Sequence, residues 1–169
     1  MHFALLTEQD SQAIADYYQR NQTHFKPWSP KRSYDFYQLE QVNQRMAGIL
    51  NAQAQQHEAH WLMWHNQQII GHCTLSNIVR GPFQACYMGY GIDEAYQNHG
   101  LMQPFCQHVI DYAFNELGLH RIMANYMPHN TRSGALLERL GFVKEGLAKD
   151  YLKINGRWEN HVLTVLTHR

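Results

Sequence analysis

The stretch from Gly89 to Met102 combines residue types that can bind an anion. It begins with two glycines, Gly89 and Gly91, inside an otherwise aromatic strand. Glycines at such positions weaken a strand and mark a bulge or the close approach of another backbone. A polar loop with Gly100 follows, and a helix is predicted to begin next, with Pro104 in its first turn. Unpaired N–H groups at a helix start attract anions, so this loop is a candidate phosphate site, although an ordinary strand–loop–helix connection fits the same pattern.

A second stretch, from His120 to Ser133, leads from a predicted strand into a predicted helix that Gly141 closes. The segments "QNHGLM" and "PHNTRSGALLERLGF" lie about 30 residues apart and resemble the acetyl-CoA loop and the following Asn-helix-Gly-Phe unit of the GNAT N-acetyltransferase superfamily. The segments "SNIVRGPFQACYMGYGI", "HRIMANYMPHNTRSGALLERLGF" and "AKDYLKINGRWENHVLTVLT" are similar to the RimJ type, the ribosomal-protein alanine N-acetyltransferases. This resemblance extends from about Phe25 to the C-terminus.

The resemblance implies a sheet that splays at its centre and holds acetyl-CoA in the gap. The pantetheine arm would pair with the strand backbone, and the pyrophosphate would rest on N–H groups of the loop. Asn130 would hydrogen-bond the pantetheine, and Ser133 would lie near the sulfur. The implied cofactor-binding residues are Tyr90, Gly91, Ile92, Gln97, Asn98, His99, Gly100, Leu101, Met102, Asn130 and Ser133.

Two residues depart from the pattern of the family. Met102 stands where the family loop ends in Gly or Ala, which leaves less room beside the phosphate but retains the backbone contact. Leu137 stands where many relatives place a tyrosine that protonates the leaving thiolate. Ser133 is then the candidate acid, as in the RimL branch. Its alternative role is to cap the helix that begins near Thr131.

The implied reaction also needs a group that removes a proton from the amine. An α-amino group has a pKa about 2.5 units below that of lysine, which saves about 3.5 kcal/mol of deprotonation work. A weak base, acting directly or through water, is therefore enough for a protein N-terminus. The candidate carboxylates are Glu94, Asp150 and Glu145, and the sequence does not decide among them. Direct attack of the amine on the thioester requires no covalent intermediate.

The acceptor follows from the resemblance alone, which implies the N-terminal amino group of a ribosomal protein that begins with alanine. A small amine such as a polyamine or an amino sugar is a same-fold alternative. A non-catalytic acyl-CoA-binding ribosome-assembly factor is a second alternative. Exposed aromatic residues in the segment from Phe25 to Trp28 could line the acceptor pocket, and an ordinary loop is equally compatible with them.

The elements that must position these residues alternate between strands and helices. The pattern predicts a strand, two helices, three strands, a helix, a strand, a helix and two strands, with a final hairpin that turns at Asn155-Gly156. The second helix is expected from about Ser33 to Gln56. The fold class is therefore α+β, a GNAT acyl-CoA N-acyltransferase fold with one mixed, mostly antiparallel sheet, flanked by helices. Residues 1–169 are expected to form a single GNAT domain.

The composition bears on the cellular location of the protein and on the partners that it can bind. Fourteen basic residues balance fourteen acidic ones, so the basic excess of a nucleic-acid binder is missing and direct nucleic-acid binding is not expected. Cys73, Cys86 and Cys106 form neither a disulfide framework nor a zinc ribbon, and no metal site is expected. A cytoplasmic protein without membrane association, a monomer or weak dimer, is the resulting prediction.

Overall fold

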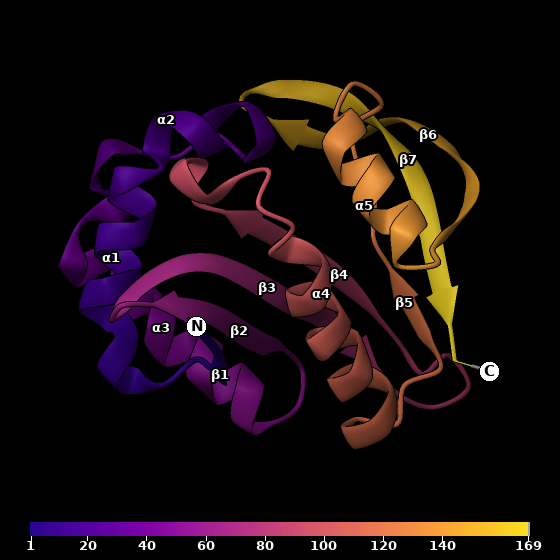
Figure 1. Cartoon of the computed structure of the whole chain (residues 1–169), viewed down its shortest axis with the longest axis horizontal. Helices are drawn as coiled ribbons and strands as arrows, with labels where there is room; N and C mark the ends of the chain where they lie inside the picture. The colour runs from indigo at the N-terminus through magenta and orange to yellow at the C-terminus, as the bar shows by residue number, and fades with distance from the viewer. Residues whose placement is uncertain (169) are drawn as a thin grey trace.

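One mixed sheet of seven strands forms the centre of the computed structural model, which describes residues 1–168 (Figure 1). The strands lie in the order β1-β2-β3-β4-β5-β7-β6, and only the β4–β5 pair is parallel. Their bounds are His2–Leu5 (β1), Ala59–His65 (β2), Gln68–Val79 (β3), Ala85–Ile92 (β4), Arg121–Met123 (β5), Val143–Ile154 (β6) and Arg157–Thr167 (β7). The mixed, mostly antiparallel sheet expected from the sequence is confirmed.

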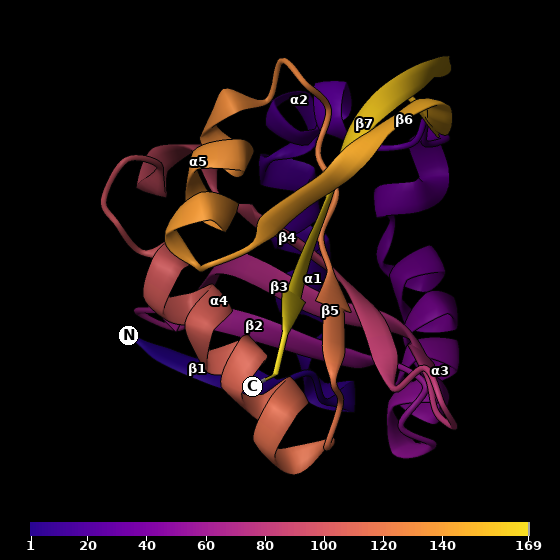
Figure 2. The same cartoon turned by 90° about the vertical axis from the view of Figure 1, so that its right-hand side faces the viewer.

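Helices cover both faces of this sheet, as Figure 2 shows. The first three α-helices, with the segment that joins them, lie on one face, and α4 and α5 lie on the other. Their bounds are Ser11–Arg20 (α1), Gln22–Phe25 (α2), Leu39–Ala54 (α3), Met102–Asp111 (α4) and Thr131–Arg139 (α5). Short helices cover Glu8–Asp10, Lys26–Trp28, Tyr34–Tyr37, Glu94–Tyr96 and Tyr112–Glu116.

The alternation of side chains along the strands produces two separate cores. On β2, Leu62 packs into the cluster beneath α1 and α3, while its neighbour Met63 packs into the larger cluster beneath α4 and α5. On β3, Cys73 and Leu75 also belong to the larger cluster. Successive side chains of a strand point to opposite faces, so each central strand joins both cores.

The sheet opens between β4 and β5. These strands pair only from Ala85 to Tyr87, opposite Arg121 to Met123, whereas β4 stays paired with β3 as far as Ile92. Beyond the split, the chain after β5 turns toward β7, where Tyr126 forms an isolated bridge with Val162. The edge of β4 from Met88 onward is left without a strand partner on the β5 side.

The predicted helix ends and the last hairpin turn are confirmed, and the start of α3 differs from its prediction. Gly118 and Gly141 end their helices with positive φ, and Asn155-Gly156 forms the last hairpin turn. The helix expected from Ser33 begins instead at Leu39. A 3₁₀ turn occupies residues 34–37, and Gln38, with ψ of 143°, is extended and interrupts the helical backbone.

None of the helices in the described part of the chain combines the length and the apolar character that crossing a membrane requires.

We predict opposite effects from two glycine-to-alanine changes in helices. At Gly134 of α5, a Cβ would lie 2.8 Å from the ring of the buried Tyr126, and the overpacking should cost about 1–3 kcal/mol of unfolding free energy. At Gly48 of α3, no heavy atom lies within 4 Å of the added Cβ. Gly48→Ala should therefore stabilise the protein by about 0.5–1 kcal/mol through helix propensity. Urea unfolding measures both changes, and equal stabilisation by the two would contradict the close packing of α5.

Candidate active site

The unpaired end of β4 has a bare face and an aromatic face. Gly89 and Gly91 pair with Thr74 and His72 of β3, so they share the face beneath α1 and α3. An added Cβ at Gly89 would meet no heavy atom within 4 Å, and one at Gly91 would lie 2.6 Å from Cε1 of His72. Tyr90 points to the opposite face, toward α4 and α5. The two glycines predicted to mark a close approach thus carry no side chain on this face, which is open at Gly89 and is approached by the His72 ring at Gly91.

A cavity of about 490 Å³ lies beside the bare face. Its walls come from α1, the α2–α3 segment, α3 and strands β2 to β4. Phe25 and Trp28 are among the lining residues, as are Tyr17, Tyr18 and Phe36. Phe25 and Trp28 therefore line a cavity, and the interpretation that this cavity receives the acceptor stays a prediction.

His72 is a half-buried imidazole in the wall of this cavity. Its Nδ1 lies 3.0 Å from the hydroxyl oxygen of Tyr17, and its ring packs against Tyr18 and Phe25. Burial and the neighbouring charge of His60 lower the pKa of His72 to about 4, so this side chain is neutral at pH 7. No sequence motif pointed to His72, because its partners lie on a helix 55 positions away.

His60 also lines the cavity and belongs to a chain of polar side chains. Its Nε2 lies 2.8 Å from a carboxylate oxygen of Glu58, and its Nδ1 lies 3.4 Å from the hydroxyl oxygen of Thr74. Thr74 lines the same cavity. The sequence showed His60 near His57, but only the pairing of β2 with β3 brings Thr74 opposite His60.

On the other side of β4, two hydroxyl groups bridge the strand and α5. The hydroxyl oxygen of Tyr90 lies 2.7 Å from Oγ of Ser133. Burial raises the pKa of the Tyr90 phenol, so the phenol stays protonated at neutral pH. Asn130 caps α5, because its Oδ1 accepts a hydrogen bond from the backbone N–H of Ser133 at 3.3 Å. The capping role considered for the Ser133 side chain is therefore filled by Asn130.

The loop predicted to bind phosphate joins β4 to the start of α4. Asn98 and Gly100 have positive φ, 63° and 73°, and α4 begins at Met102 as the sequence indicated. Oε1 of Gln97 accepts a hydrogen bond from Arg132 of α5 at 2.8 Å, which ties the loop to the helix across the gap. Asn98, His99 and Gly100 are exposed, and Leu101 is half-buried.

A buried carboxylate holds the end of β4 against α1. Asp93, 4% exposed, accepts hydrogen bonds from Arg20 at 2.8 Å, from Asn21 at 3.1 Å and from the backbone N–H of Ala95 at 3.0 Å. Burial alone would raise the pKa of Asp93, but these donors outweigh it and lower the pKa. Sequence analysis missed Asp93, which stabilises the geometry of the site from outside the cavity.

The three carboxylates predicted as bases lie elsewhere. Glu94 is exposed beyond the end of β4, and Asp150 is exposed at a bulge of β6 with φ of 45°. Glu145 forms an ion pair with Arg121. Among residues 1–168, neither Asp nor Glu contributes a side chain to the lining of the 490 Å³ cavity. The structure brings histidines, rather than these carboxylates, to that cavity.

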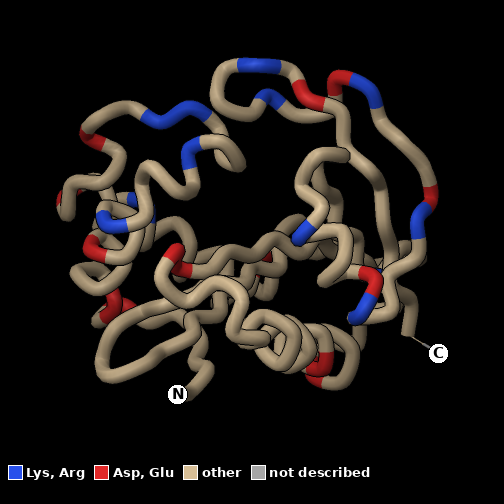
Figure 3. Tube along the Cα trace, turned by 45° about the horizontal axis from the view of Figure 1, so that its top comes forward, with Lys and Arg blue, Asp and Glu red and all other residues tan. Residues whose placement is uncertain are grey.

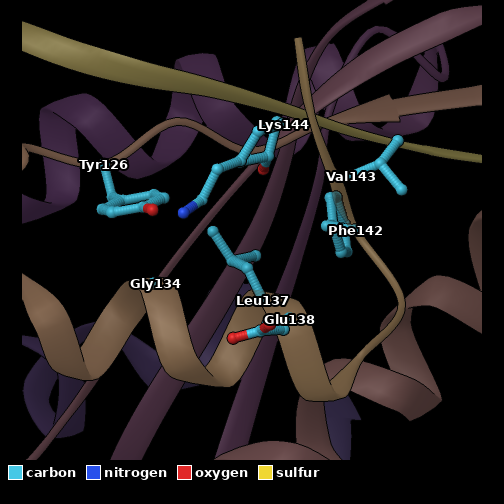
Figure 4. Close-up of a pocket in the computed structure, with 8 residues that line it drawn as sticks. Tyr126, Gly134, Leu137, Glu138, Phe142, Val143 and Lys144 are labelled. Atoms are coloured by element: carbon cyan, nitrogen blue, oxygen red, sulfur yellow. The ribbon is translucent and has the colours of Figure 1, made fainter. Parts of the chain in front are cut away.

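A second cavity, of about 300 Å³, lies between α5 and β6 (Figure 4). Leu137 projects into it from α5, between Tyr126 and Phe142, and the amine of Lys144 points toward Tyr126. Leu137 is almost fully buried, with 1% of its surface exposed. The position for which the family resemblance implied a tyrosine thus carries a buried apolar side chain.

Comparison with known proteins assigns this architecture to a family. The sequence model described as "Acetyltransferase (GNAT) domain" matches residues 2–143. The chain belongs to the GNAT acetyltransferase family. This acetyltransferase is 45% identical to the [ribosomal protein uS5]-alanine N-acetyltransferase of Escherichia coli K12 over 166 residues, covering 96% of this chain and 85% of that relative.

Solved structures agree with the assignment. The ribosomal-protein-S5-alanine acetyltransferase of Vibrio fischeri superposes on the acetyltransferase with a TM-score of 0.94 at 41% identity, covering 98% of this chain and 91% of that one. RimJ of Mycobacterium smegmatis, in complex with CoA-disulfide, superposes with a TM-score of 0.91 at 25% identity, covering 98% and 80%.

We predict that alanine substitutions at the two glycines of β4 have very different effects on the unfolding free energy. Gly91→Ala places a methyl group against the His72 ring, which hydrogen bonding and aromatic neighbours hold in place, and should lower the unfolding free energy by about 1–3 kcal/mol. Gly89→Ala meets open space and should change it by less than about 0.5 kcal/mol. Denaturant unfolding of the acetyltransferase variants measures both. Equal losses would show that the His72 ring does not limit the space beside β4.

Proposed function

We propose that this enzyme transfers the acetyl group of acetyl-CoA to the N-terminal α-amino group of a ribosomal protein that begins with alanine. The observation that carries the proposal is the unpaired end of β4, because this one strand separates a donor side from the cavity. Gly89 leaves the backbone uncovered on the cavity face, and the His72 ring lies over Gly91. The names of the similar enzymes from Escherichia coli and Vibrio fischeri support the choice of acceptor.

The residues of the gap suit an extended donor with a pyrophosphate. An unpaired strand edge offers N–H and C=O groups to a linear amide, which is how the backbone of Tyr90, Gly91 and Ile92 would hold the pantetheine. The loop from Gln97 to Met102 leads into a helix of ten residues, whose N-terminal N–H groups would bind the pyrophosphate. Asn130 keeps its proposed role beside the pantetheine, in addition to capping α5.

Proton transfer is divided between the two faces of β4. On the donor side, Ser133 would donate a hydrogen bond to the leaving sulfur. The hydroxyl oxygen of Tyr90 lies 2.7 Å from Oγ of Ser133 and would support it there. On the cavity side, the α-amine must be neutral before it attacks. Glu94 and Asp150 remain predictions for the base, although neither lines the cavity.

The charges of the cavity argue against a polyamine as the acceptor. Arg32 and Arg45 line the cavity, and their guanidinium carbons lie 4.4 and 3.7 Å from the ring centre of Phe36. Lys and Arg positions also mark the upper left of Figure 3, where the α2–α3 segment lies. A polycation would be repelled by this lining, whereas a neutral or acidic peptide would not.

The single-domain organisation and the cytoplasmic location belong to the same proposal. The match of the family model over residues 2–143 supports one catalytic unit. The three cysteines are free and buried, which suits a reducing compartment.

A panel of short peptides that differ only in their first residue tests the function. With acetyl-CoA as donor, peptides that begin with Ala should be acetylated at the α-amine, which mass spectrometry locates. Spermidine and an amino sugar serve as competing acceptors. Faster turnover of spermidine than of any peptide would overturn the acceptor assignment, and tight acetyl-CoA binding without transfer to any amine would indicate a binding protein.

We predict that Gly100→Asp greatly weakens acetyl-CoA binding without unfolding the protein. The new carboxylate would lie at the start of α4, where it repels a pyrophosphate. An added Cβ meets no atom within 4 Å, so the positive φ of 73° is the main source of strain. Calorimetry should show at least a tenfold loss of donor affinity. Gly100→Asn, which lacks the charge, is the matched control, and an equal loss there would shift the cause to backbone strain.

We predict that Ser133→Ala lowers kcat by about 10²-fold, within the range of a positioned acid. Its melting temperature should stay close to that of the wild type, because Asn130 and not Ser133 supplies the helix cap. Tyr90→Phe should lower kcat by about tenfold, and the double variant should be no worse than Ser133→Ala, since the two hydroxyls act in series. Steady-state kinetics with a saturating peptide measures all three. An unchanged kcat in Ser133→Ala would remove Ser133 from the chemistry.

A further inference from the structure

The cavity contains one chain of hydrogen-bonded groups that leads from its interior toward solvent. Thr74 lies at the inner end, beside Gly89 on the bare face of β4. His60 follows, with 20% of its side chain exposed, and Glu58 lies at the outer end with 34% exposed. The contacts join Oγ1 of Thr74 to Nδ1 of His60 at 3.4 Å and Nε2 of His60 to Glu58 at 2.8 Å.

The two hydrogen-bond partners of His60 determine which of its ring nitrogens carries the proton. A carboxylate can only accept, so Nε2 of His60 carries the hydrogen and donates it to Glu58. In the neutral ring, Nδ1 is then a lone pair, and it accepts a hydrogen bond from the hydroxyl of Thr74. The oxygen of Thr74 keeps its own lone pairs for a group inside the cavity.

The backbone holds His60 rigidly in this arrangement. Its N–H donates to Oε1 of Gln53 at 3.0 Å, and its carbonyl accepts from the N–H of Leu6 at 2.8 Å. The pairing of His60 with Thr74 across β2 and β3 fixes the relative position of the two side chains. Because its backbone and its cross-strand neighbour are both fixed, the His60 ring is held close to Thr74 before any substrate binds.

We propose that Thr74 and His60 form the proton relay that deprotonates the acceptor amine, with Glu58 as the positioning residue. The inference deepens the proposed function and rests on it. The amine, directly or through one water, gives a proton to Oγ1 of Thr74, while the hydroxyl proton of Thr74 passes to Nδ1 of His60. The resulting imidazolium is stabilised by Glu58 and returns its proton to solvent.

The proton balance agrees with the rest of the reaction. An ammonium group loses two protons on becoming an amide, and both leave the nitrogen on the relay side and pass to solvent. Ser133 gives its hydroxyl proton to the leaving sulfur and regains a proton from solvent, so one proton is released in total. The C–S bond of the thioester breaks as the C–N bond forms. The relay and the acid thus act on opposite faces of β4 and do not compete for one proton.

Other charged and titratable groups also face His60. These are His72, Arg32, Arg45 and the tyrosines of the cavity. His72 is neutral at pH 7, with a pKa of about 4, and the phenol of Tyr17, whose pKa lies well above its usual value, is uncharged. Of the two histidines that line the cavity, His60 is therefore the one that contacts both a carboxylate, Glu58, and the hydroxyl group of Thr74.

Kinetic variants test the relay with Ala-starting peptides. Thr74→Val should lower kcat/KM for the peptide about 10²-fold, and Thr74→Ser, which restores the hydroxyl, should stay within about threefold of the wild type. His60→Asn should lose the low-pH limb of the kcat/KM profile, because that limb reports a base that must be unprotonated, and Glu58→Gln should move it. His57→Asn, an exposed histidine outside the cavity, is the matched control and should leave the profile unchanged. Full activity of Thr74→Val at every pH would overturn the relay.

An independent readout separates this inference from the proposed function. Nitrogen NMR shifts of His60 in the whole protein report which ring nitrogen carries the proton, whatever acceptor the enzyme uses. Protonation at Nε2 supports the relay, and protonation at Nδ1 overturns it. If the relay variants fail with every amine but no peptide is a substrate, the acceptor assignment falls while the relay stands.

Discussion

The split between β4 and β5 is the constraint on which the rest of this molecule depends. Parallel strands that stay paired would fill the middle of the sheet, but here pairing stops after Tyr87 and Met123. An unpaired strand edge has N–H and C=O groups that need partners, either from water or from another chain-like molecule. The proposed binding of the donor follows from the exposure of this edge.

The alternation of residues along β4 gives the strand two different faces, which separate the α5 side from the cavity. Tyr90 lies on the face toward α5, and Gly89 and Gly91 lie on the face toward the cavity. The glycines serve two purposes, because Gly91 makes room for the His72 ring and Gly89 leaves the backbone uncovered. A donor and an acceptor can therefore approach the same few residues from opposite sides without sharing a pocket.

Four side-chain hydrogen bonds hold β4 and the loop after it in place. Arg20 and Asn21 of the α1 region hold Asp93 at the end of β4, Tyr90 meets Ser133 of α5, and Gln97 meets Arg132. Each joins segments at least 35 positions apart in the chain. Because the split removes backbone hydrogen bonds, the contacts of Tyr90 with Ser133 and of Gln97 with Arg132 replace part of the lost connection between β4 and the half of the sheet that carries α5.

The sequence by itself determined the features that depend on neighbours along the chain. Gly118, Gly141 and Asn155-Gly156 end or turn their elements because their backbone conformations are local properties. The GNAT motifs were also readable, since the loop before α4 and the start of α5 are continuous segments. The order of strands and helices followed from periodicity, although the exact start of α3 did not.

Only the tertiary structure decided which side chains meet in the cavity. The contact of Thr74 with His60 depends on the β2–β3 register, and that of Tyr90 with Ser133 depends on how α5 docks across the gap. A pattern of residue types does not encode such contacts, because their geometry is set by packing between elements far apart in the chain. For the same reason the residue types along the chain indicated carboxylates as candidate bases, and only the folded chain shows that histidines line the cavity.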